Sequence, residues 1–246
     1  MDLQWSDPLG GSSNDYDLFV LNVAGSTVLC AATDTQTGTQ DPFEECYNPS
    51  GYAANSRIII AKKPSADVRA LHLANFFGTP MSIKTRGVTS GHNAGKNTVG
   101  MAATYWNSAR TGTKPFVGGA ANPTEVFSSD GPRKIFYNPD GAAITPGNVL
   151  FATNGGQTLV KPDLTAADGA SSKTPGFLPF FGTSAASPHA AGIAALVKSA
   201  RPDYTNAQIR TAMIATALDI RAAGTDRDSG FGITMAQEAV NYALTH

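Results

Sequence analysis

The chain is poor in charge, in cysteine and in long apolar runs. Of its 246 residues, 15% are charged and 41% are apolar, and the formal net charge is −1. Because no excess of basic residues gathers along the sequence, we expect no nucleic-acid partner. No apolar run reaches the roughly 18 residues that a membrane-spanning helix needs, so we expect no membrane span. The composition is that of a globular protein with one large domain or two modest ones.

The beginning of the sequence lacks the pattern of a secretion signal. Residues 1–5 form neither a basic segment nor an apolar one, so we expect no signal peptide within this sequence. The only two cysteines are Cys30 and Cys46, which are too few to define a disulfide framework. A disulfide between them and a pair of reduced thiols are both compatible with the sequence, and a disulfide would suit a secreted protein.

Short runs of strand-forming residues alternate with Gly, Asn, Asp and Pro clusters in the N-terminal part of the chain. No helical periodicity interrupts them. Their spacing predicts an antiparallel β-sandwich. The predicted strands cover residues 17–22, 27–30, 57–61, 68–74 and 81–84.

The rest of the chain alternates strand and helix signals, which indicates an α/β layer. We predict strands over residues 98–104 and 160–166, and a buried, alanine-rich helix over 190–197. Thr205 with Gln208 has the spacing of a capping box, in which each side chain satisfies an unpaired backbone donor at the start of a helix. Thr234 with Gln237 repeats this spacing and predicts the start of a last short helix.

Ser184 lies between a Gly-Thr pair and the alanine-rich helix. Its position alone favours a structural interpretation, either as the cap of the helix or as a small residue in a tight turn. The same position has a chemical use. Free backbone N–H groups and the positive end of the helix dipole stabilise an oxyanion that forms beside a serine hydroxyl. The position is therefore compatible with a nucleophile without establishing one.

The segment 182–192, Gly-Thr-Ser-Ala-Ala-Ser-Pro-His-Ala-Ala-Gly, resembles the signature around the nucleophile of the subtilisin-like (S8) serine peptidases. Residues 127–132 resemble a second family element, Phe-Ser-Ser-x-Gly-Pro. Residues 161–169 resemble the family's Lys-Pro-Asp strand, although Ala-Asp replaces Pro before the glycine. The resemblance covers 89–246 and implies an α/β fold, the C-terminal part of such a domain with a partial parallel sheet. It also implies that Ser184 is the nucleophile and that its backbone N–H belongs to the oxyanion hole.

In this family a histidine activates the serine, an aspartate orients the histidine, and an asparagine completes the oxyanion hole. The family's segments that carry these three residues precede the serine, and none is found in this sequence. His189 is no substitute, because it lies about 140° around the predicted helix from Ser184. We likewise assign no catalytic role to His72, His92 or His246. An α/β-hydrolase elbow is excluded because its second glycine is replaced by Ala186.

Residues 3–8, 14–19 and 41–45 resemble the jelly-roll insert of certain bacterial subtilases. This predicts a jelly-roll β-sandwich module over 1–88 and the peptidase part over 89–246. Asp7, Asp15 and Asp17, with Asn14, offer oxygen ligands that would suit calcium. The alternative, which the pattern favours, is that they form turns on a solvated edge. No cofactor is required for the predicted chemistry.

These features together predict a fragment of a secreted or cell-envelope serine endopeptidase that acts on peptides or proteins. The isolated chain is expected to be inactive, because its base, orienting acid and oxyanion asparagine would lie upstream. The alternative is a truncated, non-catalytic relative that binds a protein or a glycan. Because an incomplete parallel sheet exposes apolar strands, we also expect self-association.

Overall fold

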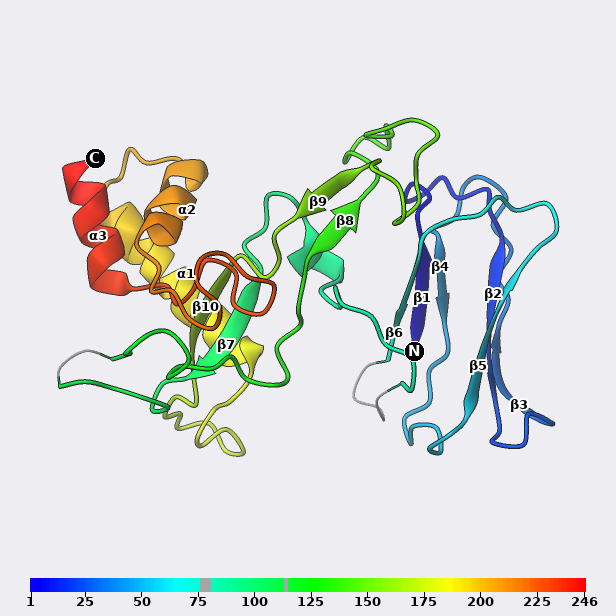
Figure 1. Cartoon of the computed structure of the whole chain (residues 1–246), viewed down its shortest axis with the longest axis horizontal. Coiled ribbons are helices and arrows are strands. Elements are labelled where there is room, and N and C mark those ends of the chain that lie inside the picture. Colours follow the sequence, from blue (N-terminus) through cyan, green and yellow to red (C-terminus); the bar gives the residue numbers. More distant parts are fainter. Residues whose placement is uncertain (76–80, 113–114) are drawn as a thin grey trace. The chain divides into compact units, whose positions relative to one another are not determined.

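The computed structural model describes residues 1–75, 81–112 and 115–246 (Figure 1). Its contacts divide the chain into two compact units. Unit 1 consists of Met1–Thr85 and Lys134–Thr158, and unit 2 consists of Arg86–Arg133 and Leu159–His246. The expected assignment of 1–88 to an insert and 89–246 to the peptidase part stays a prediction. No described helix is long and apolar enough to cross a bilayer.

Unit 1 contains two three-stranded antiparallel sheets. In the first sheet β1 (Asp2–Trp5) pairs with β4 (Phe43–Glu45) and β6 (Leu71–Ala74), and in the second β2 (Tyr16–Leu21) pairs with β3 (Val28–Ala32) and β5 (Arg57–Lys62). Alternate side chains of β1 and β2 point into one shared core, which includes Leu3, Trp5, Leu18 and Val20. The predicted antiparallel strands are confirmed, except that residues 81–84 form no strand.

The two sheets of unit 1 are also joined covalently. Cys30 in β3 and Cys46, which directly follows β4, form a disulfide. Cys46 is fully buried in the shared core. Of the two states that the sequence leaves open for these cysteines, the structure therefore contains the disulfide.

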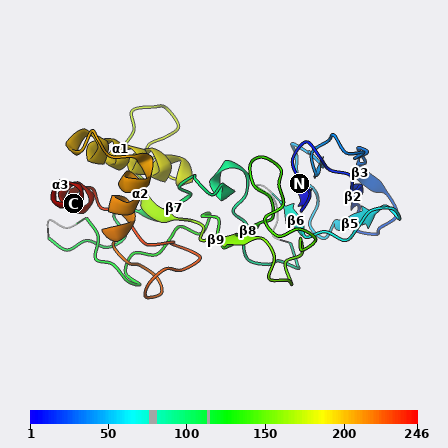
Figure 2. The ribbon, with the colours of Figure 1, turned by 90° about the horizontal axis from the view of Figure 1, so that it is seen from above.

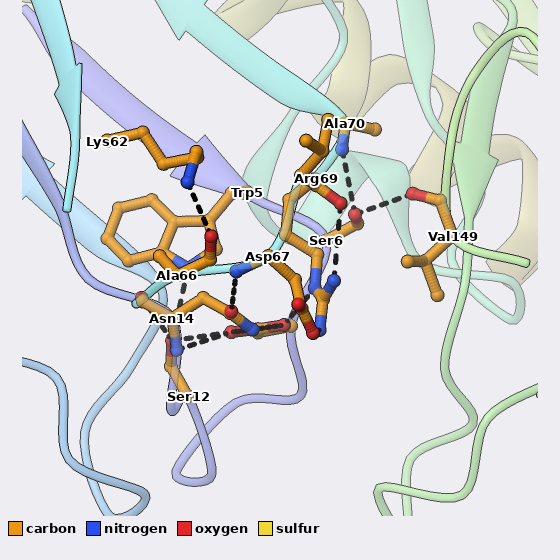
Figure 3. A network of polar contacts seen from close by, with 12 residues as sticks. Trp5, Ser6, Ser12, Asn14, Lys62, Ala66, Asp67, Arg69, Ala70 and Val149 are labelled. Carbon is orange, nitrogen blue, oxygen red and sulfur yellow. Dashed lines mark hydrogen bonds and ion pairs between the residues drawn. The ribbon is translucent and has the colours of Figure 1, made fainter. Parts of the chain in front are cut away.

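A buried polar network follows β1 in unit 1 (Figure 3). The carboxylate of Asp7 accepts hydrogen bonds from Ser12 Oγ at 2.9 Å and from Asn14 Nδ2 at 2.9 and 3.0 Å. Arg69 Nε donates to the same carboxylate at 2.6 Å. Because Asp7 is buried, its carboxylate is shielded from water, and these donors supply the hydrogen bonds that water would otherwise provide. Burial alone would raise the pKa of Asp7, but the hydrogen bonds from Arg69, Asn14 and Ser12 and the charge of Arg69 together outweigh it and hold the pKa below its ordinary value.

Unit 2 is built on two parallel strands. β7 (Met101–Tyr105) pairs with β10 (Leu164–Asp168), and Ile233 adds a parallel bridge to Thr165 on the other side of β10. Three helices gather beside these strands (Figures 1 and 2), namely α1 (Thr183–Ala200), α2 (Asn206–Ala215) and α3 (Ala236–Thr245). The helix α1 contacts both strands and both other helices. The chain also has a short 3-10 helix η1 (Gly91–Ala94) and a two-stranded sheet of β8 (Arg133–Ile135) and β9 (Gln157–Leu159).

The outer edge of β7 is partly occupied by the chain itself. The carbonyl of Ala103 accepts the N–H of Glu125 at 2.8 Å, and the N–H of Ala103 donates to Ser128 Oγ at 3.0 Å. The segment that contains Glu125 and Ser128 thus satisfies the middle of an edge that we expected to be open. Self-association through this sheet stays a prediction.

One of the two predicted capping boxes is confirmed and the other is wrong. Thr205 is the N-cap of α2, where its side chain accepts the N–H of Gln208 and the Gln208 side chain accepts the N–H of Thr205. The N-cap of α3 is Met235, which makes no side-chain cap hydrogen bond. The N–H of Thr234 donates to Thr165 O, as part of the pairing beside β10, and is therefore not available for the reciprocal bond to the Gln237 side chain that a capping box requires.

Candidate active site

The site around Ser184 begins at Gly182, a position that only glycine occupies without backbone strain. Gly182 is the N-cap of α1 and has a φ of 118°, in the region that side-chain-bearing residues rarely adopt. Its carbonyl accepts the N–H groups of Ala185 at 2.9 Å and Ala186 at 3.2 Å. The structural interpretation of Ser184 as the helix cap is therefore wrong, because Gly182 holds that position.

Ser184 lies in the first turn of α1 with its side chain exposed. The first four N–H groups of an α-helix have no partner within the helix. Those of Ala185 and Ala186 are satisfied by Gly182 O, whereas those of Thr183 and Ser184 have no partner in the described part of the chain. An exposed hydroxyl thus stands beside two free N–H donors at the positive end of a helix, an arrangement suited to oxyanion stabilisation.

The carboxyl group of Asp168, at the end of β10, contacts this turn. Its Oδ2 accepts the N–H of Gly182 at 2.8 Å. Asp168 is fully buried, and burial raises the pKa of its carboxyl group above the ordinary value. The sequence identified Asp168 only as a residue of the strand or of a turn. The contact with Gly182 joins residues that lie apart in the chain, and no local pattern reveals it.

None of the described histidines is hydrogen-bonded to Ser184. His189 Nδ1 lies 2.7 Å from the carbonyl oxygen of Ala167 in β10, so this side chain ties α1 to the strand. His92 is in η1 and His72 is in β6 of the other unit. The imidazole of His246 stacks on the ring of Tyr242.

Two other aspartates of unit 2 hold the framework. Asp163 is buried with Lys161, whose Nζ lies 2.7 Å from its Oδ2, and Arg210 binds its other oxygen at 2.5 Å. Asp130 accepts the N–H groups of Gly87 and Val88 and pairs with Arg227 at 3.0 Å. Both side chains satisfy backbone or cationic groups, as expected for residues with structural roles.

Two of the predicted calcium ligands, Asp7 and Asp17, are paired with cationic side chains. No group of three or more His, Cys, Asp or Glu residues arranged for a metal ion is found among the described residues. Asp7 is occupied by Arg69, as described above, and the Oδ2 of Asp17 lies 3.1 Å from Lys63 Nζ. A cation that already neutralises a carboxylate competes with calcium for it. Calcium binding at Asp7, Asp15 and Asp17 stays a prediction.

Comparison with known proteins is consistent with this geometry. The model of the subtilase family matches residues 6–232. Subtilisin-like protease SBT3.2 of Arabidopsis thaliana is 34% identical over 143 residues, which cover 51% of this chain and 17% of that protein. Alkaline elastase YaB of a Bacillus species is 42% identical over 64 residues, which cover 26% of this chain and 16% of that protein.

Subtilisin-like protease SBT4.14 of Arabidopsis thaliana is 39% identical over 110 residues, or 43% of this chain and 14% of that protein. In each of these three comparisons the aligned stretch covers less than a fifth of the relative's own length. The family model, in contrast, matches most of the chain, including the Ser184 turn and the strands of unit 1 that follow β1. The chain therefore belongs to the subtilase family.

Proposed function

We propose that this chain is the C-terminal part of a secreted subtilisin-like serine endopeptidase, with Ser184 as its nucleophile. The observation that carries the proposal is the Ser184 turn. It combines an exposed hydroxyl, two free N–H donors and a left-handed glycine within the family's signature segment. The hydroxyl oxygen would attack the carbonyl carbon of a substrate peptide bond, and the free N–H of Ser184 would bind the oxyanion that forms.

The hydroxyl also needs a base to take its proton during the attack. No described histidine is bonded to Ser184, and the family supplies this base, its orienting acid and the oxyanion asparagine from segments that precede the serine. We therefore propose that these three groups come from polypeptide outside residues 1–246, and that this chain alone does not cleave peptides. Loss of the catalytic partners of a triad serine lowers the rate by about four to six orders of magnitude.

The sheets of unit 1 support the remaining parts of the proposal. Two antiparallel sheets around one core are the layers that a jelly-roll insert would have, and the family match runs through them. The disulfide between Cys30 and Cys46 suits an oxidising compartment, as expected for a secreted protein. The substrate would be a peptide or protein, and the chain would act only together with the upstream part of its enzyme.

The experiment that tests this function is labelling with a fluorophosphonate, which reacts with activated serines. The isolated chain should show no stoichiometric labelling, whereas the chain produced together with the upstream segment of its gene should be labelled at Ser184. In the assembled enzyme, Ser184→Ala should abolish labelling. Ser187→Ala is the matched control, since Ser187 is also exposed in the first part of α1, and it should leave labelling intact.

Rapid labelling of the isolated chain would contradict the proposed inactivity. Failure to label the assembled enzyme would favour a non-catalytic binding protein.

A further inference from the structure

Asp168 has a combination of properties that the proposed peptidase mechanism does not use. It occupies the C-terminal end of β10, and its side chain reaches back to the glycine that precedes the nucleophile's helix. The sequence departs from the subtilase pattern here, where Ala-Asp stands in place of proline before Gly169. A side chain that departs from a family pattern and contacts the turn of the candidate nucleophile has a role that needs an explanation.

The contact between Asp168 and Gly182 completes the hydrogen bonding of the turn. The carbonyl of Gly182 is held by two N–H groups of α1, and its N–H is held by Asp168 Oδ2 at 2.8 Å. Both polar groups of this left-handed residue are thus fixed, one by the helix and one by the strand. A backbone conformation of this kind costs free energy and persists where its surroundings determine it.

The end of β10 is held in place by hydrogen bonds, so the backbone that carries the Asp168 carboxyl group is fixed. Asp168 O accepts the N–H of Trp106 at 3.2 Å, and Trp106 Nε1 donates to the carbonyl of Gly169 at 2.9 Å. The ring of Tyr105 packs against that of Phe181, the residue before Gly182, with the two centroids 5.3 Å apart. Because the Asp168 backbone is fixed, its side chain also fixes the position of the Gly182 N–H to which it is bonded.

The second oxygen of the carboxyl group is unusual. Asp168 Oδ1 is buried and has no hydrogen-bond partner among the described residues. The charge of His189 favours ionisation of Asp168. Burial and the charge of Asp168 raise the pKa of Glu125, the other titratable group that interacts with this carboxyl. Burial outweighs both His189 and the N–H of Gly182, and it raises the pKa of Asp168. Burying a carboxyl group with one unpaired oxygen destabilises the fold. The interaction that this carboxyl group provides in return is its hydrogen bond to the turn before Ser184.

We propose that Asp168 is a positioning residue for Ser184, which holds the N–H of Gly182 and so fixes the turn from which Ser184 enters α1. This inference rests on the proposed function of Ser184 as the nucleophile. Loss of the Asp168 contact would release the N–H of Gly182, loosen the first turn of α1 and misdirect the hydroxyl and N–H of Ser184.

The test uses a thiol in place of the hydroxyl, in the full chain and without any need for peptidase activity. Ser184→Cys introduces a unique free thiol, since Cys30 and Cys46 are bonded to each other. A helix N-terminus lowers the pKa of a thiol and increases its thiolate fraction. The rate of alkylation by iodoacetamide, measured from pH 6 to 10, then reports both the pKa and the accessibility of this group.

In the Ser184→Cys background, Asp168→Ala should lower the alkylation rate at pH 7 by about two- to fivefold, the range by which a helix N-terminus stabilises an exposed anion. The thiol pKa should rise accordingly. Asp168→Asn should retain the rate, since an amide oxygen still accepts the N–H of Gly182. Asp130→Ala is the matched control, because Asp130 also accepts a glycine N–H, that of Gly87, yet makes no contact with Ser184. It should leave the rate unchanged.

A folded Asp168→Ala variant with an unchanged thiol pKa and alkylation rate would overturn the proposal. If that variant does not fold, hydrogen exchange of the unsubstituted chain decides instead. The Gly182 amide should exchange more slowly than in an unstructured peptide, and exchange at the unstructured rate would overturn the proposal. Alkylation needs neither a base nor a substrate, so this proposal can fail while Ser184 proves catalytic. The fluorophosphonate test can equally fail while the positioning role stands.

Discussion

At the scale of single residues, the backbone conformation of Gly182 determines where α1 begins and therefore where Ser184 lies in its first turn. Its φ of 118° lies in a region that a residue with a side chain enters only with strain. Added atoms would meet no steric obstacle at this position, because the nearest heavy atom to a Cβ there is the Ser184 nitrogen at 3.6 Å. Any effect of a substitution would therefore come from the backbone conformation itself.

We predict that Gly182→Ala destabilises the chain by about 1–3 kcal/mol, the cost of a strained backbone conformation. Gly192→Ala is the matched control. Gly192 lies inside α1, no heavy atom lies within 4 Å of its Cβ position, and its φ is not in the left-handed region. Alanine there should stabilise the helix by about 0.5–1 kcal/mol. Urea unfolding followed by circular dichroism measures both changes, and equal effects of the two substitutions would contradict the prediction.

The residues around Ser184 also show what the sequence can predict of the site. The signature predicts Ser184 as the nucleophile, because the serine and its neighbours are consecutive in the chain. The helix cap is misjudged, since the pattern of a small polar residue before a helix does not reveal the φ of Gly182. The role of Asp168 is missed because its partner is reached only through the folding of the loop between β10 and α1. Local chemistry is therefore predictable here, whereas contacts across the turn are not.

At the scale of elements, the two capping-box patterns show when a local signal decides a helix boundary. No strand in the described part of the chain pairs with the segment before α2, and Thr205 begins the helix as predicted. Thr234 has the same spacing to a glutamine, but strand pairing engages its backbone N–H and the helix begins later. Residues 81–84 have the composition of a strand but form none. A local pattern thus determines the element only where no tertiary contact opposes it.

We predict that Thr205→Ala lowers the free energy of unfolding by about 1 kcal/mol, the usual cost of losing an N-cap. Thr211→Ala is the matched control on the same helix. The hydroxyl of Thr211 only donates back to the carbonyl of Ala207, and its side chain is exposed. Alanine is the better helix former there, so this substitution should be neutral or slightly stabilising. The comparison uses urea unfolding midpoints at constant slope, and a loss at Thr211 as large as that at Thr205 would count against the cap.

At the scale of the whole molecule, the composition and strand spacing predicted an antiparallel N-terminal part and an α/β C-terminal part, and the structure contains both kinds of sheet. Residues 134–158 were not predicted to join the N-terminal strands, because Gly-, Pro- and Asn-rich segments carry no periodicity that assigns them to a core. Their place is set by contacts such as the hydrogen bond from Ser6 Oγ to Val149 O at 2.7 Å (Figure 3).

Each compact unit has a core of its own, and only unit 1 contains a disulfide. We therefore predict that calorimetry resolves two unfolding transitions, and that Cys30→Ala with Cys46→Ala lowers only one of them. The two cysteines are separated by 16 positions, and closing a loop of that size stabilises a fold by about 3 kcal/mol. Thr205→Ala is the reciprocal control, because it weakens a helix of unit 2 and should lower only the other transition. If the cysteine substitutions shift both transitions equally, the two units unfold as one cooperative structure and the division by contacts has no thermodynamic counterpart.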